Sequence, residues 1–479
     1  MISERNQRTH ITMKVIIGSF PSKILINIKY FDINDPIFYL YSKSSVMEQV
    51  YPVIVVPGIT ATYLDDHYLL PPETVWSVLT KKFGQVALHP DQVRYEALEP
   101  ARVQSGQIYE IAYRELIQEL RHNLSASDEN PVPVYPFGYD WRQPLEHTEA
   151  RLEALITEVI ERTRLMRYYH HDWFLKDPKV NLVGHSMGGL IIAGYLEKHK
   201  KNHRVDKVVT LATPFGGSFE AVIKLATGTA NLGTPAPSSR EREAARVTPS
   251  LYYLLPDCKG VEAPGDVNPD LFDPAVWQPS IVETIRQYVE KHSVTGGDDT
   301  EKASLLFSGF LQSAREHRLR IRKWKLETAG LKSGNWLCIA GVNSTTRVGV
   351  KIDRNQQGLF FDFNRNDRKN EWSQPESDRQ MLTGDGTVPL RSAIPGFLDP
   401  ANIVCLSPDD FGYWEIQDRA TEKLAGFHGL LPNMNVIHRL IVRHFTGRAD
   451  RYRNTWGRSL PGIGMTKWKP PFDLFRRTD

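Results

Sequence analysis

The sequence predicts an α/β fold in which a mostly parallel central sheet is flanked by helices and carries an inserted cap or lid. Short apolar runs rich in β-branched residues, such as 51–57 and 205–212, recur along the chain, and segments of helical periodicity separate them. Strands that alternate with helices form βαβ units, whose parallel strands are covered on both faces. The pattern loosens between 218 and 332, which predicts the insertion.

The composition is that of a globular protein. The chain has 479 residues, of which 41% are hydrophobic and 24% charged, and this length accommodates an enzyme core with large insertions. A formal net charge of +3 gives no basis for nucleic-acid binding. Cys258, Cys338 and Cys405 form no C-x-x-C pair, so we expect neither a disulfide framework nor a thiolate metal site.

Residues 1–46 are expected to form an N-terminal leader. Two short apolar runs, 15–17 and 24–28, are interrupted at 21–23, and no small-residue cleavage site follows, so the segment is a poor secretory signal. No stretch of the chain approaches the roughly 20 apolar residues of a membrane-spanning helix. These two features slightly favour a cytoplasmic location.

The core elements begin at residue 51. The apolar run 51–57 predicts a buried strand that ends at Gly58. Helical spacing predicts helices, and a strand weakened by prolines is expected at 132–137. The other predicted strands are 179–183, 205–212, 336–341 and 402–406, and the predicted helices are 108–121, 145–168 and 190–198.

These elements divide the chain into four parts. The core is predicted from 47–217 and 333–450, and alternation over 348–363 predicts a β-hairpin within it. The segment 218–332 contains a Pro/Asp/Gly-rich stretch at 256–279 and scattered helical patterns. We expect it to be a cap or lid, since long insertions over active sites are the functional exception to short loops. Residues 451–479 form a C-terminal tail.

Gly184-His-Ser-Met-Gly188 matches the pattern G-x-S-x-G. A predicted strand stops immediately before the motif and a helical pattern starts immediately after it, which is the context that a nucleophile elbow requires. The glycines let the backbone pass closely, so that the Oγ of Ser186 is held above the sheet edge at a helix N-terminus. Ser186 is the predicted nucleophile of an α/β-hydrolase.

In this fold the acid follows the serine along the chain and the histidine comes last. Asp385 is the candidate acid because it lies in a turn flanked by glycines, downstream of the strand at 336–341. Asp367 and Asp378 are the alternatives. An acid in this position would hold the histidine in the correct tautomer and stabilise the imidazolium.

His428 is the candidate base. It lies in a predicted loop after the strand 402–406 and before a helical stretch near 436–444. His438 competes with it, but falls inside that helical stretch. His185, beside the serine, is expected to line the elbow.

The chain resembles the lecithin:cholesterol acyltransferase-like family of α/β-hydrolases. Four segments carry the resemblance over roughly residues 51–446: the strand and Pro-Gly turn at 53–58, Tyr-Asp-Trp-Arg at 139–142, the elbow at 184–189 and Gly-Asp-Gly-Thr-Val at 384–388. The resemblance implies an α/β-hydrolase core, a cap domain, and phospholipase, lipase or acyltransferase chemistry. It also implies Ser186 as nucleophile, Asp385 as acid and His428 as base.

The expected mechanism proceeds through an acyl-enzyme, with the oxyanion held by backbone N–H groups. Met187, after the nucleophile, is one expected donor, and Ile59, after Pro57-Gly58, is the other by position and analogy. We expect residues 139–142 to be structural.

For three aromatic residues the sequence allows two interpretations each. Trp76 is either an interfacial anchor or a core residue. Phe215 and Phe219 either line an acyl pocket or belong to the core.

Three functions stay open at this point. The first is a lipid-ester hydrolase or O-acyltransferase, whose partner is a lipid or other ester with peripheral membrane contact as an option. The second is an esterase or amidase on small soluble substrates, and the third is a non-catalytic hydrolase-like scaffold. The chain has no H-E-x-x-H pair and no G-x-G-x-x-G after a strand, so neither a metal nor a dinucleotide cofactor is expected.

Overall fold

The computed structural model describes residues 13–17, 24–28, 49–229, 236–257, 259–363, 368–369, 384–412, 415 and 426–476. Cys258, Asp367 and Asp378 lie outside the described residues. The chain divides into two compact units, Met1–Gln49 and Val50–Asp479. In the first unit, β1 (Met13–Ile17) pairs antiparallel with β2 (Ile24–Ile28). All further description concerns the second unit.

Six strands form the central sheet, in the order β18-β13-β11-β10-β3-β9, and every pairing between neighbours is parallel. The strands are β3 (Val53–Val56), β9 (Val134–Pro136), β10 (Val180–His185), β11 (Val205–Leu211), β13 (Trp336–Gly341) and β18 (Val404–Leu406). β3, β10, β13 and β18 are buried along their whole length, because helices cover both faces of the sheet. The predicted α/β fold is confirmed.

The strand order reverses between β3 and β10. From β3 the chain moves outward to the edge strand β9, then returns to the other side of β3 and continues through β10, β11, β13 and β18. In open parallel sheets, ligands bind outside the carboxyl ends of the strands at such a switch point. The loops that leave β3 and β10 therefore flank the expected site.

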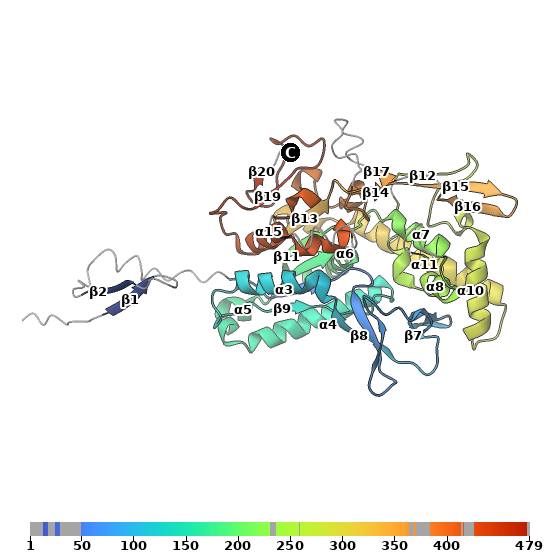
Figure 1. The fold of residues 1–479 in the computed structure, drawn as a ribbon, viewed down its shortest axis with the longest axis horizontal. Coiled ribbons are helices and arrows are strands. Elements are labelled where there is room, and N and C mark those ends of the chain that lie inside the picture. Colours follow the sequence, from blue (N-terminus) through green and yellow to red (C-terminus); the bar gives the residue numbers. More distant parts are fainter. Residues whose placement is uncertain are drawn as a thin grey trace, which may run out of the picture. The chain divides into compact units, whose positions relative to one another are not determined.

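Two helix layers cover the sheet (Figure 1). α4 (Leu145–Arg164) and α6 (Met187–His199) share one hydrophobic cluster with Ile54 and Leu182. α3 (Glu110–Leu124) and α15 (Asn435–Thr446) share a second cluster with Val53 and Val183. Adjacent strand residues point to opposite faces, so each strand contributes to both clusters.

A helical insertion lies between β11 and β13. It comprises α7 (Phe219–Thr227), α8 (Ser239–Arg246), α9 (Pro249–Tyr252), α10 (Pro279–His292) and α11 (Asp299–Lys323), which gather at one end of the unit in Figure 1. These helices fall within 218–332, the segment assigned to the cap. α11 begins at a strong cap, since the Asp298 carboxylate accepts hydrogen bonds from the N–H groups of Thr300 and Glu301.

A buried polar contact joins the helical insertion to the core. His317 of α11 lies 2.9 Å from the Oε1 of Glu149 on α4, and both side chains are buried. A Cβ at Gly194 on α6 would overlap this carboxylate, so the absence of a side chain there leaves room for the pair. Burial of a polar or charged group is costly unless the group is paired. A displacement of α11 would break this pair, so the contact favours the observed position of α11 against α4.

A small antiparallel sheet follows the first core strand. It contains β4 (Thr62–Asp66), β5 (Glu73–Trp76) and β8 (Val103–Ile108), in the order β5-β4-β8. A hairpin of β6 (Leu88–His89) and β7 (Gln92–Glu96) lies between β5 and β8 in the chain. The predicted hairpin at 348–363 is present as β15 (Val350–Asn355) and β16 (Gly358–Asp362).

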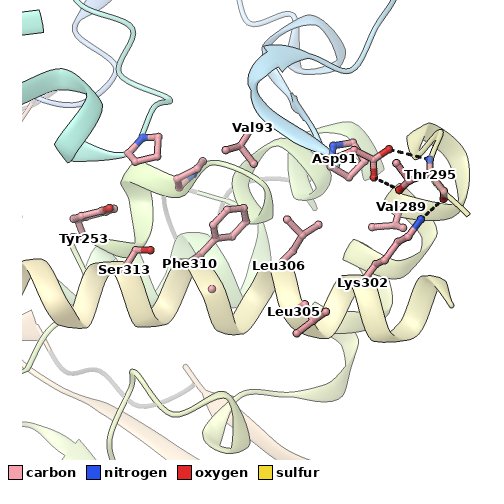
Figure 2. A pocket seen from close by; sticks show the side chains of 14 residues that line it. Asp91, Val93, Tyr253, Val289, Thr295, Lys302, Leu305, Leu306, Phe310 and Ser313 are labelled. Carbon is pink, nitrogen blue, oxygen red and sulfur yellow. Dashed lines mark hydrogen bonds between the residues drawn. The ribbon is translucent and has the colours of Figure 1, made fainter. Parts of the chain in front are cut away.

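The turn between β6 and β7 contacts α10 and α11 around a hollow of about 530 Å³ (Figure 2). The Asp91 carboxylate accepts hydrogen bonds from the Ser293 hydroxyl (2.7 Å) and the Val294 N–H (2.7 Å) beyond the end of α10. Lys302 of α11 donates to the same Ser293 hydroxyl at 2.9 Å. These contacts tie the hairpin to the helical insertion.

Every helix in the described ranges is too short or too polar to cross a membrane.

Candidate active site

The elbow holds Ser186 in a strained conformation. Ser186 lies between the end of β10 and the start of α6, with φ 53° and ψ −127°. Non-glycine residues rarely adopt a positive φ, and such outliers cluster at functional sites. The flanking glycines are required by close approach: a Cβ at Gly184 would lie 2.7 Å from the Cδ1 of Ile192, and one at Gly188 would overlap the carbonyl oxygen of Val56.

The structure brings Ser186, His428 and Asp385 into one hydrogen-bonded series. The Nε2 of His428 lies 2.9 Å from the Oγ of Ser186, and its Nδ1 lies 2.7 Å from the Oδ2 of Asp385. An ionised carboxylate only accepts hydrogen bonds, so the Nδ1 carries the proton. The Nε2 is then free to accept the proton of the Ser186 hydroxyl, which is the geometry of general-base activation.

Asp385 is held by its own turn. Its Oδ1 accepts hydrogen bonds from the N–H groups of Thr387 (2.9 Å) and Val388 (2.7 Å), which leaves Oδ2 for the imidazole. The residue is 1% exposed. Gly341, the last residue of β13, makes this possible, because a Cβ there would lie 2.5 Å from the Cβ of Asp385.

The two predicted oxyanion donors lie just after the two strands that flank the switch point, β10 and β3. Met187 is the first residue of α6, where N–H groups have no partner within the helix. Gly58, which precedes Ile59, approaches the nucleophile so closely that a Cβ there would lie 3.0 Å from the Cβ of Ser186. Within the described ranges, neither the Met187 N–H nor the Ile59 N–H has an intramolecular acceptor.

The peptide groups around Ile59 are fixed by buried side chains. The Tyr139 hydroxyl donates to the carbonyl oxygen of Pro57 (2.9 Å), and the indole N–H of Trp76 donates to that of Thr60 (3.0 Å). The ring of Trp141 packs against that of Trp76, with centroids 4.8 Å apart. The Tyr-Asp-Trp-Arg segment is therefore a support for the loop after β3.

Arg142 completes this support from within the core. Its buried guanidinium lies 2.7 Å from the Asp140 carboxylate and 2.9 Å from the Glu96 carboxylate of β7. Despite the burial of Arg142, these carboxylates raise the pKa of its guanidinium. The paired charge can be buried because its donors are satisfied.

The remaining candidates have structural positions. Trp76 is buried, so its interpretation as a membrane anchor is wrong and the core interpretation holds. Phe215 and Phe219 are also buried in the core cluster. His438 is buried in α15 with its Nε2 2.8 Å from the carbonyl oxygen of Pro432, away from Ser186. Within the described residues, no group of three or more His, Cys, Asp or Glu side chains is placed to hold a metal.

Sequence reasoning missed Tyr113. Its hydroxyl lies 2.8 Å from the Nδ1 of His185 and accepts a hydrogen bond from the Gly58 N–H at 3.0 Å. The only signal was its apolar-face position in the predicted helix 108–121, which is equally typical of a packing residue. His185 itself lines the elbow, as expected, with its Nε2 2.9 Å from the carbonyl oxygen of His428.

Comparison with known proteins points to one family. The family model described as lecithin:cholesterol acyltransferase matches residues 86–291, a stretch that contains Ser186 and ends before Asp385. The chain is 33% identical over 148 residues to phosphatidylcholine-sterol acyltransferase of Gallus gallus, which covers 29% of this chain and 32% of the relative. The protein of the same name from Oryctolagus cuniculus is 28% identical over 197 residues, covering 37% and 39%. The chain thus spans about a third of the length of the curated relatives it matches.

A solved structure supports the fold. A chain in the crystal structure of the Tle4–Tli4 complex superposes with a TM-score of 0.55 at 14% identity, covering 84% of this chain and 99% of that chain. At this identity the likeness concerns the fold alone. The family match by itself confirms that this chain resembles the lecithin:cholesterol acyltransferase family.

Proposed function

We propose that this protein is a serine-dependent lipid-ester hydrolase or O-acyltransferase that works through an acyl-enzyme. The observation that carries the proposal is the hydrogen-bonded series from the Ser186 hydroxyl through the His428 imidazole to the buried Asp385 carboxylate. The family resemblance supports a lipid ester as the substrate class.

In the proposed first half-reaction, the Oγ of Ser186 bonds to the ester carbonyl carbon while the Nε2 of His428 takes its proton. The carbonyl electron pair moves to the oxygen, which the N–H groups of Met187 and Ile59 stabilise. Collapse of this intermediate breaks the bond to the leaving alkoxide, and His428 returns the proton to it. Asp385 stays ionised throughout and stabilises the imidazolium.

The second half-reaction decides between hydrolase and acyltransferase. Water or an alcohol attacks the acyl-enzyme carbonyl, His428 takes the proton of the attacking hydroxyl, and the proton returns to the Oγ of Ser186 as the ester bond breaks. The acyl-enzyme is common to both outcomes, so the products with and without an alcohol acceptor distinguish them.

Contact with a lipid surface is a further part of the proposal. Leu70, in the β4–β5 connection, is 97% exposed, and Leu79, shortly after β5, is 93% exposed. This small sheet begins three residues after Ile59, so its tips belong to the same connection that supplies the proposed oxyanion donor. These two leucines are the proposed contacts with an apolar surface.

The test is a panel of phospholipids and neutral lipids, offered with and without an alcohol acceptor to the wild type and to Ser186→Ala. We expect ester cleavage by the wild type, loss of cleavage in the variant, and labelling of Ser186 by a fluorophosphonate probe. Ser250→Ala is the matched control, since Ser250 is a buried serine whose hydroxyl has no partner in the described ranges. Turnover of soluble esters alone would favour the small-ester alternative, and an unlabelled wild type would refute the proposal.

A further inference from the structure

We propose that Tyr113 and His185 are positioning residues that fix the oxyanion loop and the base His428 relative to each other. The inference rests on the proposed function, because it assigns a role to two buried side chains around the same site. Neither residue touches the reacting atoms in the proposed mechanism, so both act through the backbone groups that they hold.

A continuous series of hydrogen bonds carries the proposal. The Gly58 N–H donates to the Tyr113 hydroxyl (3.0 Å), and this hydroxyl lies 2.8 Å from the Nδ1 of His185. The Nε2 of His185 then lies 2.9 Å from the carbonyl oxygen of His428. Tyr113 is 1% and His185 5% exposed, so water does not replace these contacts. One end of the series is the N–H of Gly58, the residue before Ile59, and the other is the carbonyl oxygen of His428.

Only one arrangement of protons satisfies every member of the series. The Gly58 N–H can only donate, so the Tyr113 oxygen accepts and its own O–H must donate to the Nδ1 of His185. The Nδ1 is therefore unprotonated, and the Nε2 carries the hydrogen that the His428 carbonyl accepts. The tautomer of His185 is thus fixed by its two neighbours, and a buried network that is fully satisfied specifies a single geometry.

The side chains of Tyr113 and His185 both stay uncharged around neutral pH. Burial, and to a smaller extent the nearby His428, lowers the pKa of His185 from 6.5 to about 3. Burial also raises the pKa of the Tyr113 hydroxyl above its ordinary value. The series of donors and acceptors consequently persists across neutral pH. It also prevents His185 from serving as a base, because both of its ring nitrogens are engaged.

The two anchored segments must act on one reacting carbonyl group. His428 would remove the nucleophile's proton while the Ile59 N–H receives the developing charge on the same substrate. Errors of about 1 Å in such constellations cost roughly 100-fold in rate. The hydrogen bonds through Tyr113 and His185 connect the two segments directly. They would therefore hold His428 and Ile59 at the required spacing before the substrate binds.

The experiment compares Tyr113→Phe with the wild type on the ester cleaved best in the lipid panel. Phenylalanine keeps the ring but removes the acceptor of the Gly58 N–H and the donor to His185. We expect kcat to fall roughly 10- to 100-fold while KM changes little. Tyr169→Phe is the matched control: Tyr169 is a buried tyrosine whose hydroxyl donates to the Val50 carbonyl at 2.8 Å, and its loss should leave kcat unchanged.

A second pair of variants tests the same series at His185. The side-chain amide of His185→Gln offers an acceptor oxygen and an NH2 donor group, whereas His185→Leu offers neither, so kcat should be partly retained only in the glutamine variant. The downfield proton resonance of the His428 Nδ1–H provides an independent readout. It should shift or broaden in Tyr113→Phe and His185→Leu and stay in place in Tyr169→Phe.

The outcomes separate this inference from the proposed function. A wild type that labels at Ser186 and cleaves esters, together with a folded Tyr113→Phe of unchanged kcat and resonance, would overturn the positioning role alone. If Tyr113→Phe does not fold, equal kcat in the two His185 variants would overturn it. A wild type that neither labels nor cleaves would refute the proposed function, and the resonance would still test the geometry.

Discussion

Asp385 holds His428 at two points. Its Oδ2 lies 2.7 Å from the imidazole Nδ1, and its backbone carbonyl accepts a hydrogen bond from the His428 N–H at 3.1 Å. The carboxylate thereby sets the tautomer of the imidazole, and the main-chain contact satisfies an N–H group in the first turn of the short helix α14 (Phe427–Leu430).

Asp385→Asn should lower kcat roughly 1,000- to 10,000-fold while the protein remains folded. An amide nitrogen can face the Nδ1 of His428 and stabilise the wrong tautomer, and a neutral side chain no longer stabilises the imidazolium. Steady-state kinetics on the preferred ester measure the change. Asp298→Asn is the control, because asparagine still caps α11, and it should keep wild-type kcat. A loss of less than tenfold in Asp385→Asn would argue against its assignment as the acid.

Gly58→Ala should reduce kcat without unfolding the protein. The new methyl group would lie 3.0 Å from the Cβ of Ser186 and 3.5 Å from its Oγ, so either the serine or the oxyanion loop must shift by a few tenths of an ångström. We expect about a tenfold loss, since the reacting geometry tolerates little displacement. Gly309→Ala on α11 meets no atom within 4 Å and should keep full activity. Equal kcat in the two variants would contradict this assignment of the loop.

Gly194→Ala should destabilise the contact between the helical insertion and the core. Its Cβ would overlap the Glu149 carboxylate, which is hydrogen-bonded to His317 of α11. Overpacking of this kind costs about 1–3 kcal/mol in the free energy of unfolding. Chemical denaturation measures the loss, and the Gly309→Ala protein provides the reference for a glycine replaced in open space. An unchanged unfolding midpoint would show that α4 and α11 separate readily.

Replacement of Leu70 and Leu79 by serine should lower activity on lipid vesicles and spare activity on a monomeric soluble ester. Both side chains are almost fully exposed in the connections next to the small sheet, so their removal should weaken surface binding and leave the folded core unchanged. Vesicle co-sedimentation measures the binding step. Leu165, 87% exposed just after α4, gives the control Leu165→Ser, which should bind vesicles normally. Equal binding by all three proteins would remove the small sheet from the proposal.

His185 should make the protein less stable as the pH falls below about 6.5. In the unfolded chain this imidazole becomes protonated below about pH 6.5, whereas burial in the folded protein lowers its pKa to about 3. Stability that is complete above pH 6.5 is therefore lost progressively toward pH 3, at about 1.4 kcal/mol per pH unit for one proton. The buried His444 contributes in the same direction, so His185→Gln should reduce this dependence by about one proton in urea unfolding between about pH 4 and 7. Tyr169→Phe retains the imidazole and should keep the wild-type slope.

The sequence predicted the elements whose signals are local. β13 has the predicted limits, and the elbow follows β10 as expected. Both were predictable because apolar runs and glycine spacing depend only on residues that are close together in the chain. α6 begins at Met187 rather than at 190, since the glycines after the serine conceal the first helical turn. β8 was missed because its polar residues lack the alternation of a half-buried strand.

The candidate site was predictable in its main members and not in its supports. Ser186, Asp385 and His428 each have a recognisable local context, and the structure brings them together. Their catalytic roles stay predictions. His428 was expected in a loop and instead lies in the first turn of α14. The contact between Tyr113 and His185 joins residues 72 positions apart, so no local pattern reports it.

The parallel pairing of β11 with β13 has a consequence for how this protein can diversify. The two strands are parallel neighbours, so the chain that leaves at the carboxyl end of β11 must return to the amino end of β13 by a crossover of roughly a dozen residues or more. The sheet therefore sets a minimum length for that crossover, and no maximum. The helical insertion can therefore vary in length and composition while the neighbouring strand ends keep their positions in the sheet.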